Sequence, residues 1–136
     1  MKITILDATT LGDDLISELP VIFSDFGDVE VNLFTQQDKV AATVVDSDIV
    51  IVNKLKLNES NLKTAKNLKL ICATATGYDN IDIEYCKKHG ITVESLEKAT
   101  QDTENIYLKS KMEDMLKIYS AYNNEVKDNY IDEEFD

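Results

Sequence analysis

Two short segments carry residue types that could bind a small anion, and the first is the loop of residues 74–80. In this loop Thr76 and Gly77 precede an acidic residue and an amide, Asp79 and Asn80. Glycine lets a ligand approach the main chain closely, so the N–H groups of Thr76 and Gly77 could form an anion-binding nest beside a helix start. The alternative is that Gly77 only serves the turn and that Asp79 or Asn80 only caps the helix.

The second segment is Asn53 and Lys54, which directly follow a continuous apolar run. Lys54 could supply a positive charge to a carboxylate ligand, and the simpler alternative is an ordinary surface lysine. Asp7 follows another apolar run and could form a further wall of the same pocket, or, more simply, a polar connection to the next helix. His89 precedes Gly90 at a helix end, where a cation favours the helix dipole, so we expect it to be structural.

The elements that would bring these residues together follow from alternating apolar and helical patterns. The expected strands are residues 2–7, 29–34, 49–52, 69–73 and 91–94; the expected helices are 13–19 (ended by Pro20), 38–45, 58 or 60 to 65, and 81–89. Strands that alternate with helices indicate a parallel sheet covered on both faces. We therefore predict an α/β fold, a flavodoxin-like three-layer sandwich with a five-stranded parallel sheet of order 2-1-3-4-5. Asn53 and the loop after residue 73 would then share the carboxyl edge of the sheet, where such sheets bind ligands.

The chain changes character after residue 94. Residues 95–136 contain no glycine or proline and carry apolar residues spaced three and four apart: Leu108, Met112, Met115, Tyr119, Tyr122 and Val126. This spacing predicts a long C-terminal amphipathic helix, so we expect a domain over residues 1–94 and a helical acidic tail over residues 95–136. The apolar stripe could pack on its own domain or on a second copy of the chain, and the tail could instead be disordered.

Composition limits the chemistry open to this chain of 136 residues. Its net charge is −12, with fourteen lysines and no arginine. The charge argues against nucleic acid as a partner, and without arginine a small anion depends on main-chain amides, hydroxyl groups or lysine. Cys72 and Cys86, with a single histidine, match no metal-ligand spacing, so we expect no metal site. Free cysteines, no recognisable signal peptide and no apolar run long enough to span a membrane are typical of a cytoplasmic protein.

Several of these segments together resemble one enzyme family. Residues 71–82 match a strand, glycine loop and D-N-hydrophobic-D signature, and residues 86–93, 51–54 and 57–59 follow the same family order. Residues 1–93 thereby resemble the amino-terminal, substrate-binding domain of the NAD-dependent D-isomer-specific 2-hydroxyacid dehydrogenases, especially the glycerate dehydrogenase/hydroxypyruvate reductase-like branch. The resemblance implies that the carboxylate of a small 2-hydroxy or 2-oxo acid is held by the N–H groups of Thr76 and Gly77, beside a wall formed by Asn53 and Lys54.

The resemblance ends after Val93. In the family an Asn-Val-x-Gly segment follows, and then a dinucleotide-binding domain with a G-x-G-x-x-G loop and the catalytic Arg, Glu and His; here no glycine follows Gly90. We therefore expect no catalytic residue and no bound cofactor in this chain, with NAD implied for the complete family enzyme. Two functions remain open. One is a substrate-binding domain that is inactive unless another chain supplies the rest, and the other is a non-enzymatic flavodoxin-like module whose C-terminal helix mediates self-association.

Overall fold

A single parallel sheet organises the computed structural model of this chain, which describes residues 2–22, 28–74, 78–95, 110, 113 and 114. The strands are β1 (Lys2–Ile5), β2 (Asp28–Val31), β3 (Ile49–Val52), β4 (Leu70–Ala73) and β5 (Thr92–Ser95). The helices are η1 (Ala8–Leu11), α1 (Asp13–Ile22), η2 (Gln37–Lys39), α2 (Val40–Val44), α3 (Glu59–Leu62) and α4 (Ile83–Lys88). All neighbouring strands pair in parallel, in the order β2-β1-β3-β4-β5. The predicted α/β class and strand order are confirmed.

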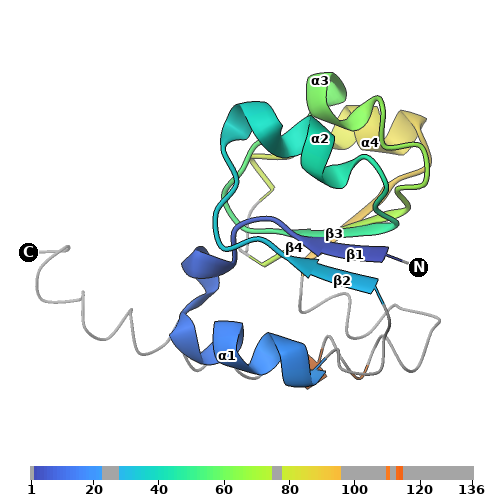
Figure 1. Cartoon of the computed structure of the whole chain (residues 1–136). Helices are drawn as coiled ribbons and strands as arrows, with labels where there is room; N and C mark the ends of the chain where they lie inside the picture. The colour runs from blue at the N-terminus through green and yellow to red at the C-terminus, as the bar shows by residue number, and fades with distance from the viewer. Residues whose placement is uncertain (1, 23–27, 75–77, 96–109, 111–112, 115–136) are drawn as a thin grey trace, which may run out of the picture.

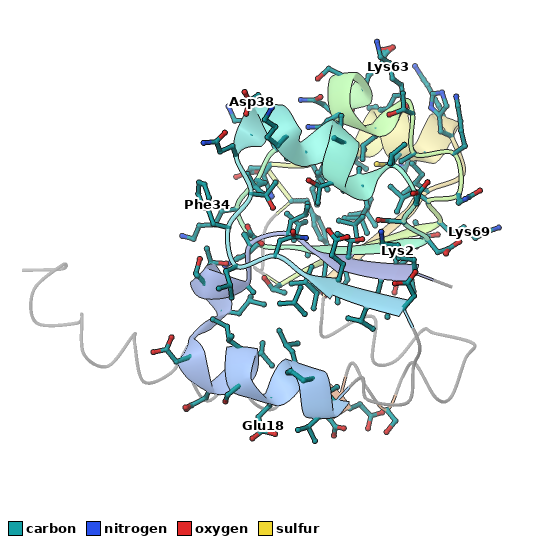
Figure 2. The ribbon with its side chains drawn as sticks, in the orientation of Figure 1. Lys2, Glu18, Phe34, Asp38, Lys63 and Lys69 are labelled. Atoms are coloured by element: carbon teal, nitrogen blue, oxygen red, sulfur yellow. The ribbon has the colours of Figure 1, made fainter. Side chains whose placement is uncertain are left out.

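Helices cover both faces of this sheet, which gives three layers. Helix α1 lies on one face, and α2, α3 and α4 lie on the other (Figure 1). Glu18 points away from the sheet on the outer side of α1, as Figure 2 shows, while the opposite side of the helix is buried. The α1-side core contains Ile3, Ile5, Ile49, Ile51 and Cys72 from the strands, with Leu15, Leu19 and Ile22 from α1. The core on the other side contains Leu6, Val50, Val52, Ile71 and Ala73, with Val40, Val44, Leu62 and Cys86.

The alternation of strand residues between these two cores explains the apolar run of β3. Successive side chains of a strand point to opposite faces, so Ile49 and Ile51 join one core while Val50 and Val52 join the other. All four residues are buried, as expected for a central strand of a parallel sheet. The central position of β3 therefore places its carboxyl end, and Asn53 after it, between the ends of β1 and β4.

The predicted end of the first helix at Leu19 is wrong, because α1 continues through Pro20 to Ile22. Proline removes one N–H···O=C bond, here to Ile16, and its ring crowds the preceding turn. Pro20 lies in the last turn of α1, where few further bonds are lost. Leu19 and Ile22 are both buried against the sheet, and their burial favours the continued helix.

Other elements also differ from their predicted bounds: β1 ends at Ile5 instead of residue 7, and α3 ends at Leu62 instead of residue 65. The second strand ends at Val31 instead of residue 34, because the carbonyl oxygens of residues 32 and 33 pair with the loop after β1. Ala8 N donates to the carbonyl oxygen of Asn32, and Thr9 N donates to that of Leu33, both at 3.0 Å. Phe34 is consequently exposed at the carboxyl edge (Figure 2). The helix predicted over residues 38–45 is divided into η2 and α2.

The predicted C-terminal helix lies outside the described residues, apart from Ser110, Glu113 and Asp114, which are helical. The division into a domain over 1–94 and a tail over 95–136 stays a prediction. Among the described helices, none has the length and apolar character needed to cross a lipid bilayer.

Candidate functional site

The carboxyl edge of the sheet brings the two candidate segments together. Val52 pairs with Ala73, and Thr74 N donates to the carbonyl oxygen of Val52 at 3.0 Å, so Asn53 begins beside the start of the 74–80 loop. At the other end of that loop, the amide nitrogen Nδ2 of Asn80 donates to the carbonyl oxygen of Asn53 at 3.3 Å. Both flanks of residues 75–77 therefore lie at Asn53. Thr76 and Gly77 themselves lie outside the described residues, and their role in substrate binding stays a prediction.

Asp7, two residues after the end of β1, is hydrogen-bonded to the main chain of this edge. Its carboxylate is buried, with Oδ1 accepting the N–H of Asn53 at 2.9 Å and Oδ2 accepting the N–H of Lys54 at 2.7 Å. Thr10 Oγ1 in turn donates to the carbonyl oxygen of Asp7 at 2.6 Å. From the sequence we expected Asp7 to form a pocket wall or a polar connection to the next helix. Neither expectation includes its hydrogen bonds to the main chain of residues 53 and 54. The predicted sheet order, which places the ends of β1 and β3 side by side, is the signal from which this contact could have been found.

Asn80 holds the same stretch of chain from the β4 side. Its Nδ2 also donates to the carbonyl oxygen of Leu55 at 2.8 Å, in addition to that of Asn53. We call residues 53–55 the 53–55 segment. Its main chain thus meets a carboxylate on one side and an amide on the other, and these groups come from opposite neighbours of β3.

The predicted helix cap at Asp79 or Asn80 is wrong, because Asp82 caps α4. Asp82 Oδ1 accepts the N–H of Tyr85 at 3.0 Å. The helix begins later than predicted because Leu57 and Ile81 form a short parallel bridge: Leu57 N donates to the carbonyl oxygen of Asn80 and Asp82 N to that of Leu57, both at 2.8 Å. Ile81 is paired in this bridge as in a strand, so it cannot be the first residue of the helix.

These bonds decide which groups of the 53–55 segment can meet a ligand. The N–H groups of Asn53 and Lys54 are occupied by Asp7 and are not available to a bound carboxylate. The Lys54 side chain is exposed and carries the positive charge of this segment. Asn53 is buried, and its Nδ2 donates to the carbonyl oxygen of Thr10 at 3.4 Å. A small anion at this wall would therefore meet the ammonium group of Lys54.

The two cysteines are excluded from nucleophilic chemistry by their surroundings. Burial in β4, with a smaller contribution from Glu94, raises the pKa of Cys72 from its usual 9.0 to about 12. Burial in α4, with a smaller contribution from Asp82, raises the pKa of Cys86 to about 11. Both thiols stay protonated at neutral pH, whereas thiol nucleophiles react as thiolates.

His89 has the surroundings of a structural residue. Its Nδ1 lies 2.9 Å from the carbonyl oxygen of Tyr85, and its ring stacks on the Tyr85 ring with centroids 4.1 Å apart. Gly90 follows with φ of +70°, a conformation that favours glycine and ends α4. This helix end precedes β5 and lies at the amino edge of the sheet, opposite Asn53. Within the described ranges, no three His, Cys, Asp or Glu side chains are grouped so that they could hold a metal ion.

Comparison with known protein families identifies two matching segments of this sequence. The model of the D-isomer specific 2-hydroxyacid dehydrogenase catalytic domain matches residues 5–104. A second family model, ADDB N-terminal, matches residues 80–136, which is less than half of the chain and overlaps the first match.

Related proteins extend the first match. A Haemophilus influenzae protein assigned to the 2-hydroxyacid dehydrogenases is 31% identical over 96 residues, which is 71% of this chain and 30% of that protein. The D-3-phosphoglycerate dehydrogenase of Methanocaldococcus jannaschii is 29% identical over 82 residues, which is 60% of this chain and 16% of that protein. The solved structure of NAD⁺-bound 3-phosphoglycerate dehydrogenase from Entamoeba histolytica has a TM-score of 0.64 at 27% identity, covering 75% of this chain and 34% of that one. This chain thus spans between 16% and 34% of the length of these relatives.

Proposed function

This chain belongs to the D-isomer specific 2-hydroxyacid dehydrogenase family through its catalytic domain, and on that basis we propose that it binds the substrate of such an enzyme. The ligand is a small 2-hydroxy or 2-oxo acid. The observation that carries the proposal is the arrangement at the carboxyl edge, where Lys54 and both flanks of the glycine loop meet around Asn53. In this proposal the N–H groups of Thr76 and Gly77 hold the ligand carboxylate and the Lys54 ammonium neutralises it.

The oxidoreductase activity belongs, in this proposal, to a larger assembly. Hydride transfer requires NAD and a dinucleotide-binding domain, and residues 1–136 contain no G-x-G-x-x-G loop and no arginine. We expect the chain alone to bind no NAD and to show no turnover of hydroxypyruvate or glyoxylate with NADH. Turnover by the purified chain would overturn this part of the proposal.

Binding of the acid alone is expected to be weak. One wall of the site and one loop supply the contacts, so we expect a dissociation constant on the order of millimolar, about −4 kcal/mol. The measurement is a titration of the ¹⁵N-labelled full chain with hydroxypyruvate, following the amide signals of Lys54, Thr76 and Gly77. Signals that stay unmoved at tens of millimolar ligand (about ten times the expected constant) would remove the binding proposal.

A matched pair of lysine substitutions makes this titration specific. Lys54→Ala removes the proposed charge and should weaken binding about tenfold. Lys63→Ala removes a charge that is also exposed, directly after α3 and away from the carboxyl edge (Figure 2), and should leave the constant unchanged. Equal effects of the two variants would show that only the overall charge matters.

A second candidate function, self-association through the predicted C-terminal helix, has its own support in the sequence. The apolar stripe from Leu108 to Val126 keeps the spacing of a helix that packs on another helix. Sedimentation of the full chain and of a Met115→Lys, Tyr119→Lys double variant tests this candidate. We expect the full chain to sediment as a dimer and the variant as a monomer. If both proteins are monomers, this candidate is refuted.

We further propose a cytoplasmic location, supported by the two free, buried cysteines.

A further inference from the structure

The 53–55 segment is held in place by two side chains that have no assigned role. It has no helical or strand hydrogen bonds of its own, and its residues form a bend directly after β3. Asp7 accepts the N–H groups of Asn53 and Lys54, and Asn80 donates to the carbonyl oxygens of Asn53 and Leu55. Four main-chain polar groups of three consecutive residues are therefore bonded by two side chains.

The two contacts are arranged on opposite sides of the segment. Asp7 comes from the chain just after β1, 46 residues before Asn53, and Asn80 comes from the chain after β4. Because β1 and β4 flank β3, one side chain reaches the segment from each neighbouring strand. A bend anchored at both sides by buried or half-buried polar groups has little freedom, so the Cα–Cβ bond of Lys54 has a fixed direction.

We propose that Asp7 and Asn80 are positioning residues, which orient the 53–55 segment so that Lys54 presents its ammonium group to the ligand carboxylate. This inference rests on the proposed function. It assigns Asp7 no contact with the ligand, because both of its carboxylate oxygens already accept main-chain N–H groups. Asp7 acts through the chain of residues 53 and 54.

The charge of Asp7 makes this proposal sharply testable. A carboxylate close to an anion site repels the anion, so removing its charge alone should strengthen anion binding. Loss of positioning has the opposite effect. In Asp7→Asn the side chain keeps one acceptor oxygen and turns an NH₂ group toward one of the two N–H donors, so one bond to the 53–55 segment is lost. The two explanations therefore predict changes of opposite sign.

The experiment compares hydroxypyruvate binding by full-length variants at a temperature where each is fully folded by circular dichroism. Asp7→Asn should raise the dissociation constant about tenfold and should speed hydrogen exchange at the amides of Asn53 and Lys54. The control, Asp14→Asn, removes an exposed carboxylate from the start of α1 at the same edge and should leave binding unchanged or slightly tighter. Asn80→Ala should weaken binding as Asp7→Asn does, and it carries the test if Asp7→Asn fails to fold.

A double variant separates positioning from a general structural effect. In the Lys54→Ala background, Asp7→Asn should weaken binding no further, because the group that it positions is gone. A full additional effect there, or unchanged or tighter binding by folded Asp7→Asn and Asn80→Ala, would overturn the inference. Failure of the unmodified chain to bind hydroxypyruvate would instead refute the proposed function and, with it, this inference.

Discussion

Raising the pH from 7 to 10 should destabilise this fold through Cys72. The side chain is fully buried at the α1 face of the sheet, and burial raises its pKa from 9.0 to about 12. The thiol of the folded chain therefore stays protonated at pH 10, while the thiol of the unfolded chain is about nine-tenths ionised. A folded-state pKa above the unfolded value means that the stability contribution is complete below pH 9 and is lost as the pH rises toward 12.

The size of this loss follows from the ionisation of the unfolded chain. At pH 10 one thiol with an unfolded pKa of 9.0 lowers the free energy of unfolding by about 1.4 kcal/mol. Because the folded thiol remains protonated throughout this interval, the loss depends on the unfolded value and hardly on the folded one. The effect of Cys72 must be isolated from every other effect of pH on stability, and a variant that lacks this thiol does so.

Urea unfolding of the full chain and of Cys72→Ala at both pH values provides that isolation. Alanine removes the thiol without placing an unsatisfied hydroxyl group in the core, as serine would. The variant should be less stable at pH 7 by about 1 kcal/mol, from the lost packing. Its further loss between pH 7 and pH 10 should be smaller than that of the unmodified chain by about 1.4 kcal/mol.

Equal losses in the two proteins would refute the reasoning. They would mean that the Cys72 thiol ionises in the folded state as it does in the unfolded state, and hence that it is accessible to water. The conclusion that this cysteine is no nucleophile would fall with the same result, because that conclusion depends on the same buried, protonated thiol.

Substitutions at three further positions test the local structure, each by urea unfolding at pH 7. Gly90→Ala should cost about 1 kcal/mol because φ is +70°, whereas Gly90→Asn should cost less; equal and negligible costs would contradict the αL turn. Asn61→Ala should lower the free energy of unfolding by about 2–3 kcal/mol, because the buried Asn61 side chain makes two hydrogen bonds: it accepts from Asn58 N at 2.9 Å and donates to the carbonyl oxygen of Lys56 at 2.8 Å. An unchanged stability would mean that water replaces both bonds. Asp82→Ala should lower the free energy of unfolding by about 1 kcal/mol because the N-cap of α4 is lost, and an unchanged stability would mean that Asp82 is not the cap.

The layout of the fold could be predicted because it depends on local patterns. The apolar run of β3 identifies a central strand from its own residues, and the alternation of strands and helices then limits the sheet to few orders. Gly90 ends α4 as its position before an apolar run suggests. These features depend on residues that are close in the sequence.

The details of the site depend on contacts between distant residues and could not be predicted in the same way. The pairing of Asp7 with Asn53 joins residues 46 positions apart, and no local pattern distinguishes this aspartate from one that opens a helix. The bridge between Leu57 and Ile81 likewise moved the start of α4, so a cap chosen from neighbouring residues was misplaced. Pro20 shows the reverse case, in which a strong local signal yields to burial of Leu19 and Ile22.

The same contacts bear on how the proposed site would respond to a dinucleotide-binding domain, if one is supplied as proposed above. Within the described part of the chain, no buried polar side-chain atom lacks a hydrogen-bond partner, and the 53–55 segment is bonded from both sides. A wall already fixed in this way loses little conformational entropy when a ligand binds. Weak binding by this chain would then reflect few contacts and not the ordering of a mobile wall. Contacts supplied by a dinucleotide-binding domain should therefore tighten binding while Asp7 and Asn80 keep their present bonds.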